Sequence, residues 1–360
     1  MKIIHFNTQK DWRGGERQLA WLMDELFKKD IKQTLFCRKK SKLDTYAIDN
    51  DINYQSFNIK FYNLFLLSYI LKKHTLKGDN VIIHCHDSKS HTIALLAKIF
   101  FMPTCKIIVD RKVMFPIKGW FSKKVKYATK YINSIICTSN AVKNLVVEST
   151  NNKNCTIIGD MIMPNNLPKG TIFKTIYGIN NPYIIGYIAA MTEEKDHFTF
   201  LKTAKEIIKT NPEIGFVLIG DGKLFDQIKT YSKELKIENN VHFLGFISNV
   251  PELINEIDLL LFTSTSEGLG STVLDFFMAK KPVVTVKNGG CEELVYNNKT
   301  GLISNIKDYK DLANNCLKFY SDSNFTNSIC YNAFEFATEN FSSKSITEKI
   351  VAAYNKVLAY

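Results

Sequence analysis

Short apolar runs alternate with helix-like segments along most of this chain of 360 residues. The apolar run at 2–7, for example, precedes the segment 16–30, where leucine, methionine and phenylalanine recur at helical spacing. Because a helix follows most of the apolar runs, successive strands are expected to pair in parallel. The other predicted strands occupy residues 33–37, 80–86, 105–110, 133–139, 182–189, 215–220, 240–245, 258–264 and 282–286. The pattern predicts an α/β fold, with doubly wound sheets covered by helices on both faces.

A break in this alternation divides the chain into two halves, and the length also suits about two domains. The break is the weakly periodic stretch 163–182, which contains three prolines. We predict an N-terminal Rossmann-like domain over 1–165, a linker over 166–181, a second Rossmann-like domain over 182–340 and a final helix over 341–360. Such domains are expected to face each other across a cleft, because sheets of this kind bind ligands at the carboxyl ends of their strands.

The two halves differ in charge. Residues 1–180 contain 29 Lys and Arg against 13 Asp and Glu, a formal charge of +16, whereas residues 181–360 contain 18 against 22, a charge of −4. In the densest basic segment, 111–130, the basic residues are interleaved with Phe115, Trp120, Phe121 and Tyr127. A solvated basic face would explain this segment. An anionic membrane surface, a phosphorylated glycolipid or a nucleic acid would explain it as well.

The cysteines and the apolar stretches indicate a cytoplasmic protein. The eight cysteines are scattered without a CxxC pair, and several lie inside apolar runs. They are therefore expected to be reduced core thiols and not a disulfide framework or a zinc site. The N-terminal residues lack the long apolar stretch of a signal peptide. The apolar stretch 64–71 is far shorter than the roughly 20 residues that cross a bilayer.

Paired glycines, Gly14 and Gly15, stand between the first predicted strand and its helix. Glycines at such a turn let the backbone approach a phosphate closely, and the helix N-terminus presents free N–H groups to it. A tight turn without any ligand would also explain them. The dinucleotide-binding pattern GxGxxG is absent from this turn.

Polar residues crowd the end of the predicted strand 80–86, where His84, His86, Asp87 and His91 follow one another closely. Histidine and aspartate are metal ligands. Strand alternation, however, puts the first two histidines on one face beside a buried sheet, without a clear further ligand. We therefore expect no metal, and a polar contact to a bound ligand instead.

The stretch SEGLGSTVLDFF at 266–277 contains two acids eight positions apart, Glu267 and Asp275. Glu267 lies in a loop at the carboxyl end of a predicted strand, and Asp275 lies in the first turns of the next helix. Ser271 or Thr272 is expected to cap that helix, whose free N–H groups point toward the same space. These features indicate a site in which backbone N–H groups bind an anion. Two carboxylates beside it can accept hydrogen bonds from hydroxyl groups.

Lys195 occupies a comparable position after the first strand of the second predicted domain, where a loop becomes a helix. It can point toward a ligand there, although a lysine is otherwise a common surface charge. Another tight turn, GDGK at 220–223, follows the next strand.

Taken in order, these stretches resemble the family 4 glycosyltransferases, which have the GT-B fold and retain the anomeric configuration of the sugar they transfer. The stretch 266–303 is similar to the family's Glu-x7-Glu signature region. Further similar stretches are GGERQ at 14–18, HCHDSKSHT at 84–92, TSNAVK at 138–143, AAMTEEKDH at 189–197, VHFLGF at 241–246 and the segment 341–358. The resemblance implies two facing Rossmann-like domains, a cleft between them, and a C-terminal helix that crosses back to the first domain.

The resemblance also implies a role for each matching residue. Glu267 would contact hydroxyls of the transferred sugar, His86 would lie near the reacting carbon, and Lys195 would neutralise the diphosphate; these three would be catalytic. Asp275 would accept hydrogen bonds from the ribose of the donor. The remaining donor-binding residues would be Gly14, Gly15, Gly268, Leu269, Gly270, Ser271 and Thr272.

The chain departs from the family pattern at two positions of the site, and also at 157–163, where IIGDMIM stands in place of the family's Pro-Asn-Gly turn and that contact is not assigned. Ala190 stands where family members commonly carry an arginine, so another base must compensate the diphosphate charge. We consider Arg17 and Arg111 for this purpose, and Asp87 as a further contact to the diphosphate or the acceptor. The second departure is Asp275, which is one methylene, about 1.5 Å, shorter than the family's glutamate. The ribose must then lie closer, or a water must bridge the gap.

The resemblance implies a retaining, metal-independent transferase without a cofactor. It would move a sugar from a UDP-, GDP- or ADP-sugar to a lipopolysaccharide, a lipid-linked acceptor or another cell-envelope glycan. The basic half would contact the inner face of the cytoplasmic membrane, and nucleic acid is not expected as a partner.

Three alternatives remain open at this stage. A GT-B protein can be a nucleotide-sugar epimerase. A glycoside hydrolase could use Glu267 and Asp275 as its carboxylate pair, which would have to flank a sugar at about 5–9 Å. A non-catalytic basic protein would bind nucleic acid or an anionic membrane.

Overall fold

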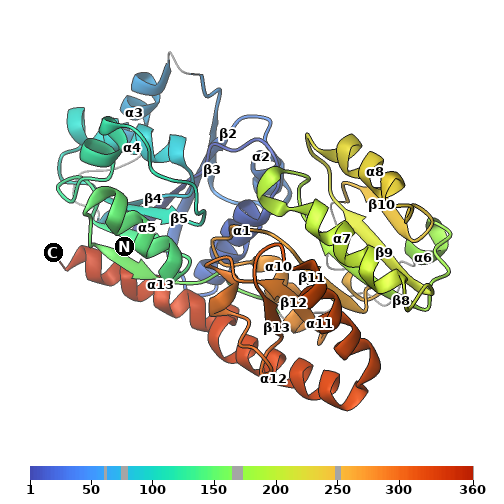
Figure 1. Ribbon diagram of the computed structural model, residues 1–360. Coiled ribbons are helices and arrows are strands. Elements are labelled where there is room, and N and C mark those ends of the chain that lie inside the picture. The colour runs from blue at the N-terminus through green and yellow to red at the C-terminus, as the bar shows by residue number, and fades with distance from the viewer. Residues whose placement is uncertain (61–62, 74–79, 164–172, 248–252, 360) are drawn as a thin grey trace. The chain divides into compact units, whose positions relative to one another are not determined.

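The computed structural model of the protein describes residues 1–60, 63–73, 80–163, 173–247 and 253–359. They form two compact units (Figure 1). The first unit comprises Met1–Met161 together with Ser343–Tyr360, and the second comprises Ile162–Ser342. The first part of the predicted linker, 166–172, lies outside the described residues.

The first unit is built on a seven-stranded parallel sheet with the order β3-β2-β1-β4-β5-β6-β7. Its strands are β1 (Lys2–Phe6), β2 (Lys32–Arg38), β3 (Tyr54–Phe57), β4 (Val81–Cys85), β5 (Lys106–Arg111), β6 (Ser134–Cys137) and β7 (Cys155–Ile157). Its helices are α1 (Gly14–Phe27), α2 (Lys42–Asp49), α3 (Leu64–Lys73), α4 (Ser88–Phe100), η2 (Ser122–Lys126), α5 (Asn140–Thr150) and α13 (Ser343–Leu358). The strand order reverses between β1 and β4, which makes this pair the switch point where doubly wound sheets bind ligands.

The second unit contains a six-stranded parallel sheet with the order β10-β9-β8-β11-β12-β13. Its strands are β8 (Tyr183–Ile188), β9 (Ile214–Ile219), β10 (Val241–Gly245), β11 (Leu259–Phe262), β12 (Val283–Val286) and β13 (Leu302–Ser304). Its helices are α6 (Phe173–Ile176), η3 (Glu193–Lys195), α7 (His197–Ile208), α8 (Phe225–Glu234), α10 (Ser271–Met278), η4 (Cys291–Glu293), α11 (Tyr309–Ser321) and α12 (Ser323–Phe341). Here the switch point lies between β8 and β11. Both sheets confirm the predicted parallel α/β class.

The C-terminal helix α13 packs with α1 in the first unit, as predicted. Its buried residues Ile346, Ile350, Tyr354 and Val357 recur at intervals of three and four, so they form one apolar stripe along the helix. This burial explains why the last helix belongs to the first unit although it follows the second in the chain.

Three short edge strands, β3, β7 and β13, were not predicted from the sequence. Each has only three or four residues, and the side chains of β3 and β7 are only partly buried. An edge strand has one neighbour, so it needs no continuous apolar run of the kind that marks β4, which is buried along its whole length.

Two further expectations concern membranes and thiols. Within the described ranges, none of the helices combines the length and the apolarity needed to cross a membrane. All eight cysteines are free thiols, and seven of them are buried, as predicted for core residues.

Candidate active site

Gly14 and Gly15 are the first two residues of α1, at the end of the loop that follows β1. The Glu16 carboxylate closes this turn by accepting hydrogen bonds from the Arg13 N–H at 3.1 Å and from Asn7 Nδ2 at 3.0 Å. Burial raises the pKa of Glu16. A Cβ added to Gly15 would meet no atom of the described residues within 4 Å. Neighbouring groups therefore do not require a glycine there, and the space beside the first turn of α1 is open to a ligand.

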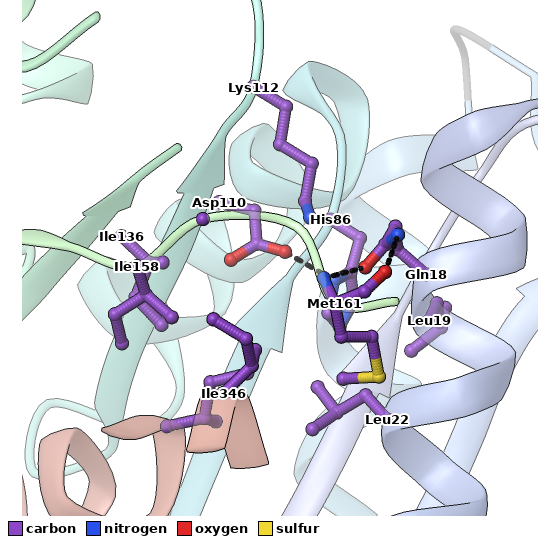
Figure 2. A pocket seen from close by; sticks show the side chains of 12 residues that line it. Gln18, Leu19, Leu22, His86, Asp110, Lys112, Ile136, Ile158, Met161 and Ile346 are labelled. Carbon is purple, nitrogen blue, oxygen red and sulfur yellow. Dashed lines mark hydrogen bonds and ion pairs between the residues drawn. The ribbon is translucent and has the colours of Figure 1, made fainter. Parts of the chain in front are cut away.

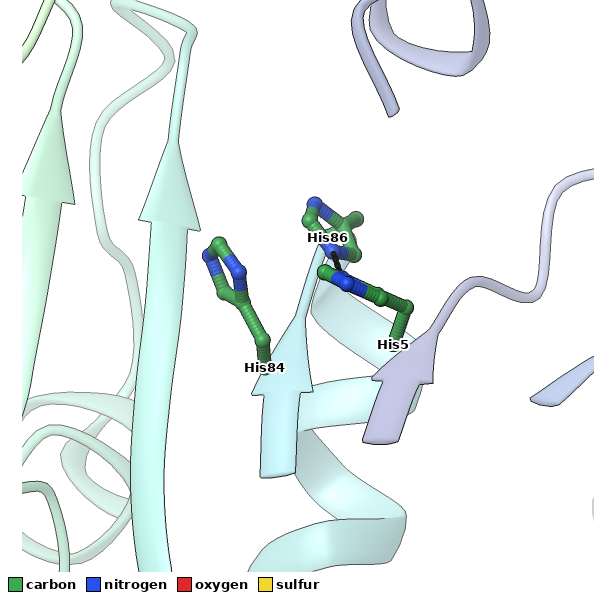
Figure 3. A group of neighbouring side chains, drawn as sticks. All are labelled: His5, His84 and His86. Atoms are coloured by element: carbon green, nitrogen blue, oxygen red, sulfur yellow. Dashed lines mark hydrogen bonds between the residues drawn. The ribbon is translucent and has the colours of Figure 1, made fainter. Parts of the chain in front are cut away.

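His86 belongs to a buried cluster of three histidines at the β1–β4 switch point (Figure 3). His86 directly follows β4, and His84 on β4 is the register partner of His5 on β1. The Asp110 carboxylate lies 2.8 Å from His84 Nε2 and 2.8 Å from His86 Nδ1. The second nitrogen of His84 lies 2.8 Å from the Tyr354 hydroxyl on α13, and that of His86 lies 3.1 Å from His5 Nδ1. One chain of hydrogen bonds thus connects three strands and the C-terminal helix.

Asp110 determines which nitrogens of these rings carry protons. Burial acts to raise the pKa of Asp110, but its interactions with His84 and His86 outweigh burial and hold the pKa well below the ordinary value. The ionised carboxylate can only accept, so His84 is protonated on Nε2 and His86 on Nδ1. The Tyr354 hydroxyl then donates to His84, and His5 Nδ1 donates to His86. Burial lowers the pKa of His86 to about 4, which keeps its ring neutral at neutral pH.

The three histidines offer nitrogens within 4.8 Å of one another, close enough for one metal ion. Both ring nitrogens of His84 and of His86 already have partners, so a metal would displace the Tyr354 hydroxyl or the third histidine. Asp87 and His91, the other residues weighed as ligands from the sequence, are not members of this group. The geometry therefore favours a polar network over a metal centre.

Asp87 serves as the N-cap of α4. Its carboxylate accepts hydrogen bonds from the N–H groups of Lys89 and Ser90, at 2.8 and 3.0 Å. It also accepts from the N–H and the hydroxyl of Thr8, at 2.5 and 2.7 Å. These four bonds connect the start of α4 to the loop after β1, so Asp87 has a structural role at the β1–β4 switch point.

The two arginines considered as substitutes for the missing base at Ala190 also lie in the first unit. The Arg17 guanidinium lies over the ring of Trp21, 4.8 Å from its centroid. Arg111, at the end of β5, donates to the backbone carbonyl of Phe115. Both side chains are thus in contact with aromatic residues of their own unit.

A cavity of about 20 Å³ lies beside His86 (Figure 2). His86, Asp110 and Lys112 form its polar side, and apolar residues of α1 and α13, such as Leu22 and Ile346, form the opposite side. The volume suits about one water molecule. An ion pair of 2.7 Å between the Lys112 ammonium and Asp160 balances the charge of the lysine.

Sequence reasoning missed Asp110 and Tyr354. Asp110 lies near the end of the predicted strand 105–110, and a polar residue at such a position is the same signal that identified His86. Tyr354 lies on the buried stripe of α13. No local pattern distinguishes it from an ordinary core tyrosine.

In the second unit, Lys195 ends the short helix η3 directly after β8, at the β8–β11 switch point. Its carbonyl accepts a hydrogen bond of 2.8 Å from the Tyr187 hydroxyl. The Thr263 hydroxyl, directly after β11, donates to the carbonyl of Asp196 at 3.0 Å. The carbonyl of Glu194 accepts from the Thr265 N–H at 2.7 Å. The backbone around Lys195 is therefore attached to the loop that leads to Glu267.

Glu267 receives a hydrogen bond from Lys195 Nζ, so the two predicted catalytic residues of this unit form an ion pair. The Glu267 backbone is paired with the loop after β12, through Glu267 N to Asn288 O at 3.3 Å and Gly290 N to Glu267 O at 3.2 Å. A Cβ on Gly290 would lie only 2.6 Å from backbone atoms of Gly268 and Leu269. This close approach holds the Glu267 loop in place.

The start of α10 differs from the prediction. Gly270, with φ at +99°, is the N-cap, so Ser271 and Thr272 are helical residues and the expectation that one of them caps the helix was wrong. Gly270 has no side chain to accept from the first turn. The Val273 N–H donates to the Gly270 carbonyl at 2.9 Å, so the N–H groups of Ser271 and Thr272 are the ones that can bind an anion. Asp275 lies in the second turn of α10 and is partly buried. The second unit thus brings Lys195 and Glu267 into contact and places the α10 N-terminus directly after the Glu267 loop.

Comparisons with known proteins bear on this arrangement. Residues 171–336, within the second unit, match the family described as Glycosyl transferases group 1. An Escherichia coli relative, UDP-Gal:alpha-D-GlcNAc-diphosphoundecaprenol alpha-1,3-galactosyltransferase, is 22% identical over 383 residues, covering 99% of this chain and 94% of that protein. The poly(ribitol-phosphate) alpha-N-acetylglucosaminyltransferase of Staphylococcus aureus (strain COL) is 24% identical over 253 residues. This match covers 69% of the chain but only 50% of the relative's length.

Solved structures establish the fold over the whole chain. Anabaena HepE, crystallised in complex with UDP-glucose, superposes with a TM-score of 0.84 at 18% identity, covering 99% of this chain and 100% of that protein. The sheets, the returning helix and these matches agree with the fold that the sequence predicted. Residues 171–336 are similar to the glycosyl transferases group 1 family, and the chain has the GT-B fold.

Proposed function

We propose that the protein is a retaining enzyme that transfers a sugar from a nucleotide-sugar donor to a lipid-linked or other cell-envelope glycan. The contact between Lys195 and Glu267 at the β8–β11 switch point carries this proposal. It combines a cation suited to a leaving diphosphate with a carboxylate suited to sugar hydroxyls. The named relatives support it, because one acts on a diphosphoundecaprenol-linked sugar and both form alpha linkages.

In this proposal the donor binds mainly to the second unit. Lys195 and the free N–H groups at the start of α10 bind the diphosphate, and Glu267 accepts hydrogen bonds from the sugar. Asp275 accepts from the ribose. Gly14 and Gly15 offer further backbone N–H groups, and His86 lies against the sugar near the reacting carbon.

The chemistry requires positioning and charge stabilisation. In a retaining transfer of this type, the acceptor hydroxyl attacks the anomeric carbon from the face on which the phosphate departs, and the hydroxyl proton passes to the leaving phosphate oxygen. The protein orients both groups and stabilises the charge that grows on the diphosphate. Lys195 and the α10 amides supply that stabilisation without a metal.

A thermal-shift screen with UDP-, GDP-, ADP- and CMP-sugars tests the donor, because a ligand that binds the native state raises the melting temperature. We expect a UDP-sugar to give the largest shift, since HepE was crystallised with UDP-glucose. The donor so identified is then incubated with a lipid-linked N-acetylglucosaminyl diphosphate, and a new alpha linkage is expected. No shift with any donor, or conversion of the donor to an epimer without an acceptor, would contradict the proposal.

The segment 111–130 is the proposed contact with the inner face of the cytoplasmic membrane. Phe115, Trp120 and Phe121 are 61%, 72% and 49% exposed, and Lys118, Lys123 and Lys124 are also exposed. Exposed aromatic rings among lysines suit an interface of acyl chains and anionic head groups. Co-sedimentation with anionic and with neutral vesicles tests this contact, and equal binding to both kinds would remove it.

A further inference from the structure

We infer that the Lys195–Glu267 ion pair makes the donor site discriminate against the bare nucleoside diphosphate in favour of the intact nucleotide sugar. The inference rests on the proposed function, and it concerns what happens to this pair when each ligand arrives.

The pair is partly withdrawn from solvent. The Lys195 and Glu267 side chains are only 21% and 14% exposed, so each charge has lost much of its hydration and depends on the other for compensation. Removing one partner of such a pair leaves the remaining charge unfavourably placed, which costs more than the same loss at an exposed site.

The backbones on both sides of the pair are attached to their surroundings. The turn of Lys195 is bonded to the loop after β11 through Thr263 and Thr265, and Glu267 is bonded to the loop after β12 through Asn288 and Gly290. A ligand therefore exchanges the partners by moving the two side chains, while the loops keep their positions.

A diphosphate that recruits Lys195 leaves the Glu267 carboxylate without its cation and beside a second anion. A bare nucleoside diphosphate offers no group to compensate that carboxylate at this position. The sugar of an intact donor does, because its hydroxyl groups donate charge-assisted hydrogen bonds to a carboxylate. The pair thus weakens the binding of the product nucleotide more than that of the donor, and it favours product release.

Glu267→Gln tests this mechanism, because it removes the charge while it keeps a carbonyl oxygen in nearly the same place. Affinities for UDP, UDP-glucose, GDP and GDP-mannose are measured by calorimetry on the full chain. We expect the glutamine variant to bind the bare diphosphate of the preferred base about tenfold more tightly than the wild type does. The affinity ratio of donor to diphosphate should fall by at least the same factor.

Lys195→Met should change the diphosphate affinity in the opposite direction, because it removes the cation and should weaken the binding of both the diphosphate and the nucleotide sugar. Loss of folding or of loop structure would weaken binding in both variants, so opposite signs distinguish the exchange from general damage. Glu193→Gln is the matched control. Glu193 lies in the same turn and pairs with Lys223 at 2.8 Å, but the two side chains are 78% and 64% exposed. The affinities of the Glu193→Gln variant for the four ligands should stay within twofold of the wild-type values.

Two negative results have different meanings. Wild-type binding of a nucleotide sugar without tighter diphosphate binding by Glu267→Gln would overturn this inference and leave the proposed function intact. A wild-type protein that binds none of the four ligands would contradict the proposed function, and the inference with it.

Discussion

The two switch points of the molecule hold their polar groups in different ways. At β1–β4, Asp110 accepts from His84 and His86, and each of these rings has a second partner in the chain. At β8–β11, Lys195 and Glu267 are held by one ion pair that remains in part exposed. A ring with both nitrogens bonded keeps its orientation and tautomer, whereas a single ion pair can exchange partners. The first unit therefore holds a preformed polar network, whereas the second contains the ion pair that we propose exchanges partners when a donor binds.

The largest expected effect is on the exchangeable pair. Glu267→Ala should reduce turnover by about 10²- to 10³-fold, because it removes a preorganised polar contact to the transferred sugar. Initial rates with the identified donor and acceptor measure this loss. Glu193→Ala, on the neighbouring turn, is the control and should stay within twofold of the wild-type rate. A reduction of less than tenfold for Glu267→Ala would contradict the proposal that the ion pair at the β8–β11 switch point takes part in turnover.

The second prediction concerns the loss of stability at low pH, which is expected in both units. Burial lowers the pKa of His86 in the first unit and, together with the charge of Lys195, that of His197 in the second unit, in each case to about 4. Because unfolded histidines titrate near pH 6.5, the unfolded state binds more protons between pH 6.5 and 4, and stability falls as the pH is lowered through that range. Each histidine should remove about 3 kcal/mol over the full range. Urea unfolding at pH 7.5, 6 and 5 measures the slope, and a constant stability down to pH 5 would show that these rings are not neutral in the fold.

The third prediction compares two glycines. Gly290→Ala should destabilise the protein by about 1–3 kcal/mol, since its Cβ would lie 2.6 Å from backbone atoms of the Glu267 loop. Gly15→Ala meets open space and lies in a helix, so stability should stay the same or rise by up to about 1 kcal/mol, while donor affinity falls. Melting temperatures and donor titrations of the two variants separate these effects. Unchanged donor affinity in Gly15→Ala would place the diphosphate elsewhere.

The smallest effect is expected at the far end of the histidine network. Tyr354→Phe removes the hydroxyl that donates to His84 and should cost about 1 kcal/mol, because one buried acceptor loses its partner. The exposed Tyr331, changed to Phe, is the control and should leave the melting temperature unchanged. Equal melting temperatures of both variants would show that the network ends at His84.

Much of the fold could be predicted because its signals are local. The apolar runs of β1, β4, β8 and β11 mark the central strands, and a polar residue directly after such a run marks the edge where ligands bind. His86 was proposed as a site residue in this way, and Lys195 and Glu267 were proposed from the loops that follow β8 and β11. The edge strands β3, β7 and β13 were missed, because strands of three or four residues with one neighbour show no continuous apolar run.

The start of α10 was misjudged for a different reason. Ser271 and Thr272 are common helix caps in sequence terms, but the positive φ of Gly270 places the helix start one residue earlier. The chain after β12 also approaches Gly270 closely, with Cys291 Sγ only 2.9 Å from where a Cβ would lie on Gly270. A contact between segments separated in the chain cannot be derived from a propensity of single residues.

The sequence by itself determined the α/β class, the family resemblance and the strand ends at which the proposed site residues lie, because these follow from periodicity and from the order of short motifs. Only the tertiary structure showed which polar groups meet. Lys195 and Glu267 are 72 positions apart, and His84 and Tyr354 are 270 apart. Hydrogen bonds and ion pairs act over about 3 Å, and strand order, which arises from the packing of the whole sheet, decides which distant residues come that close.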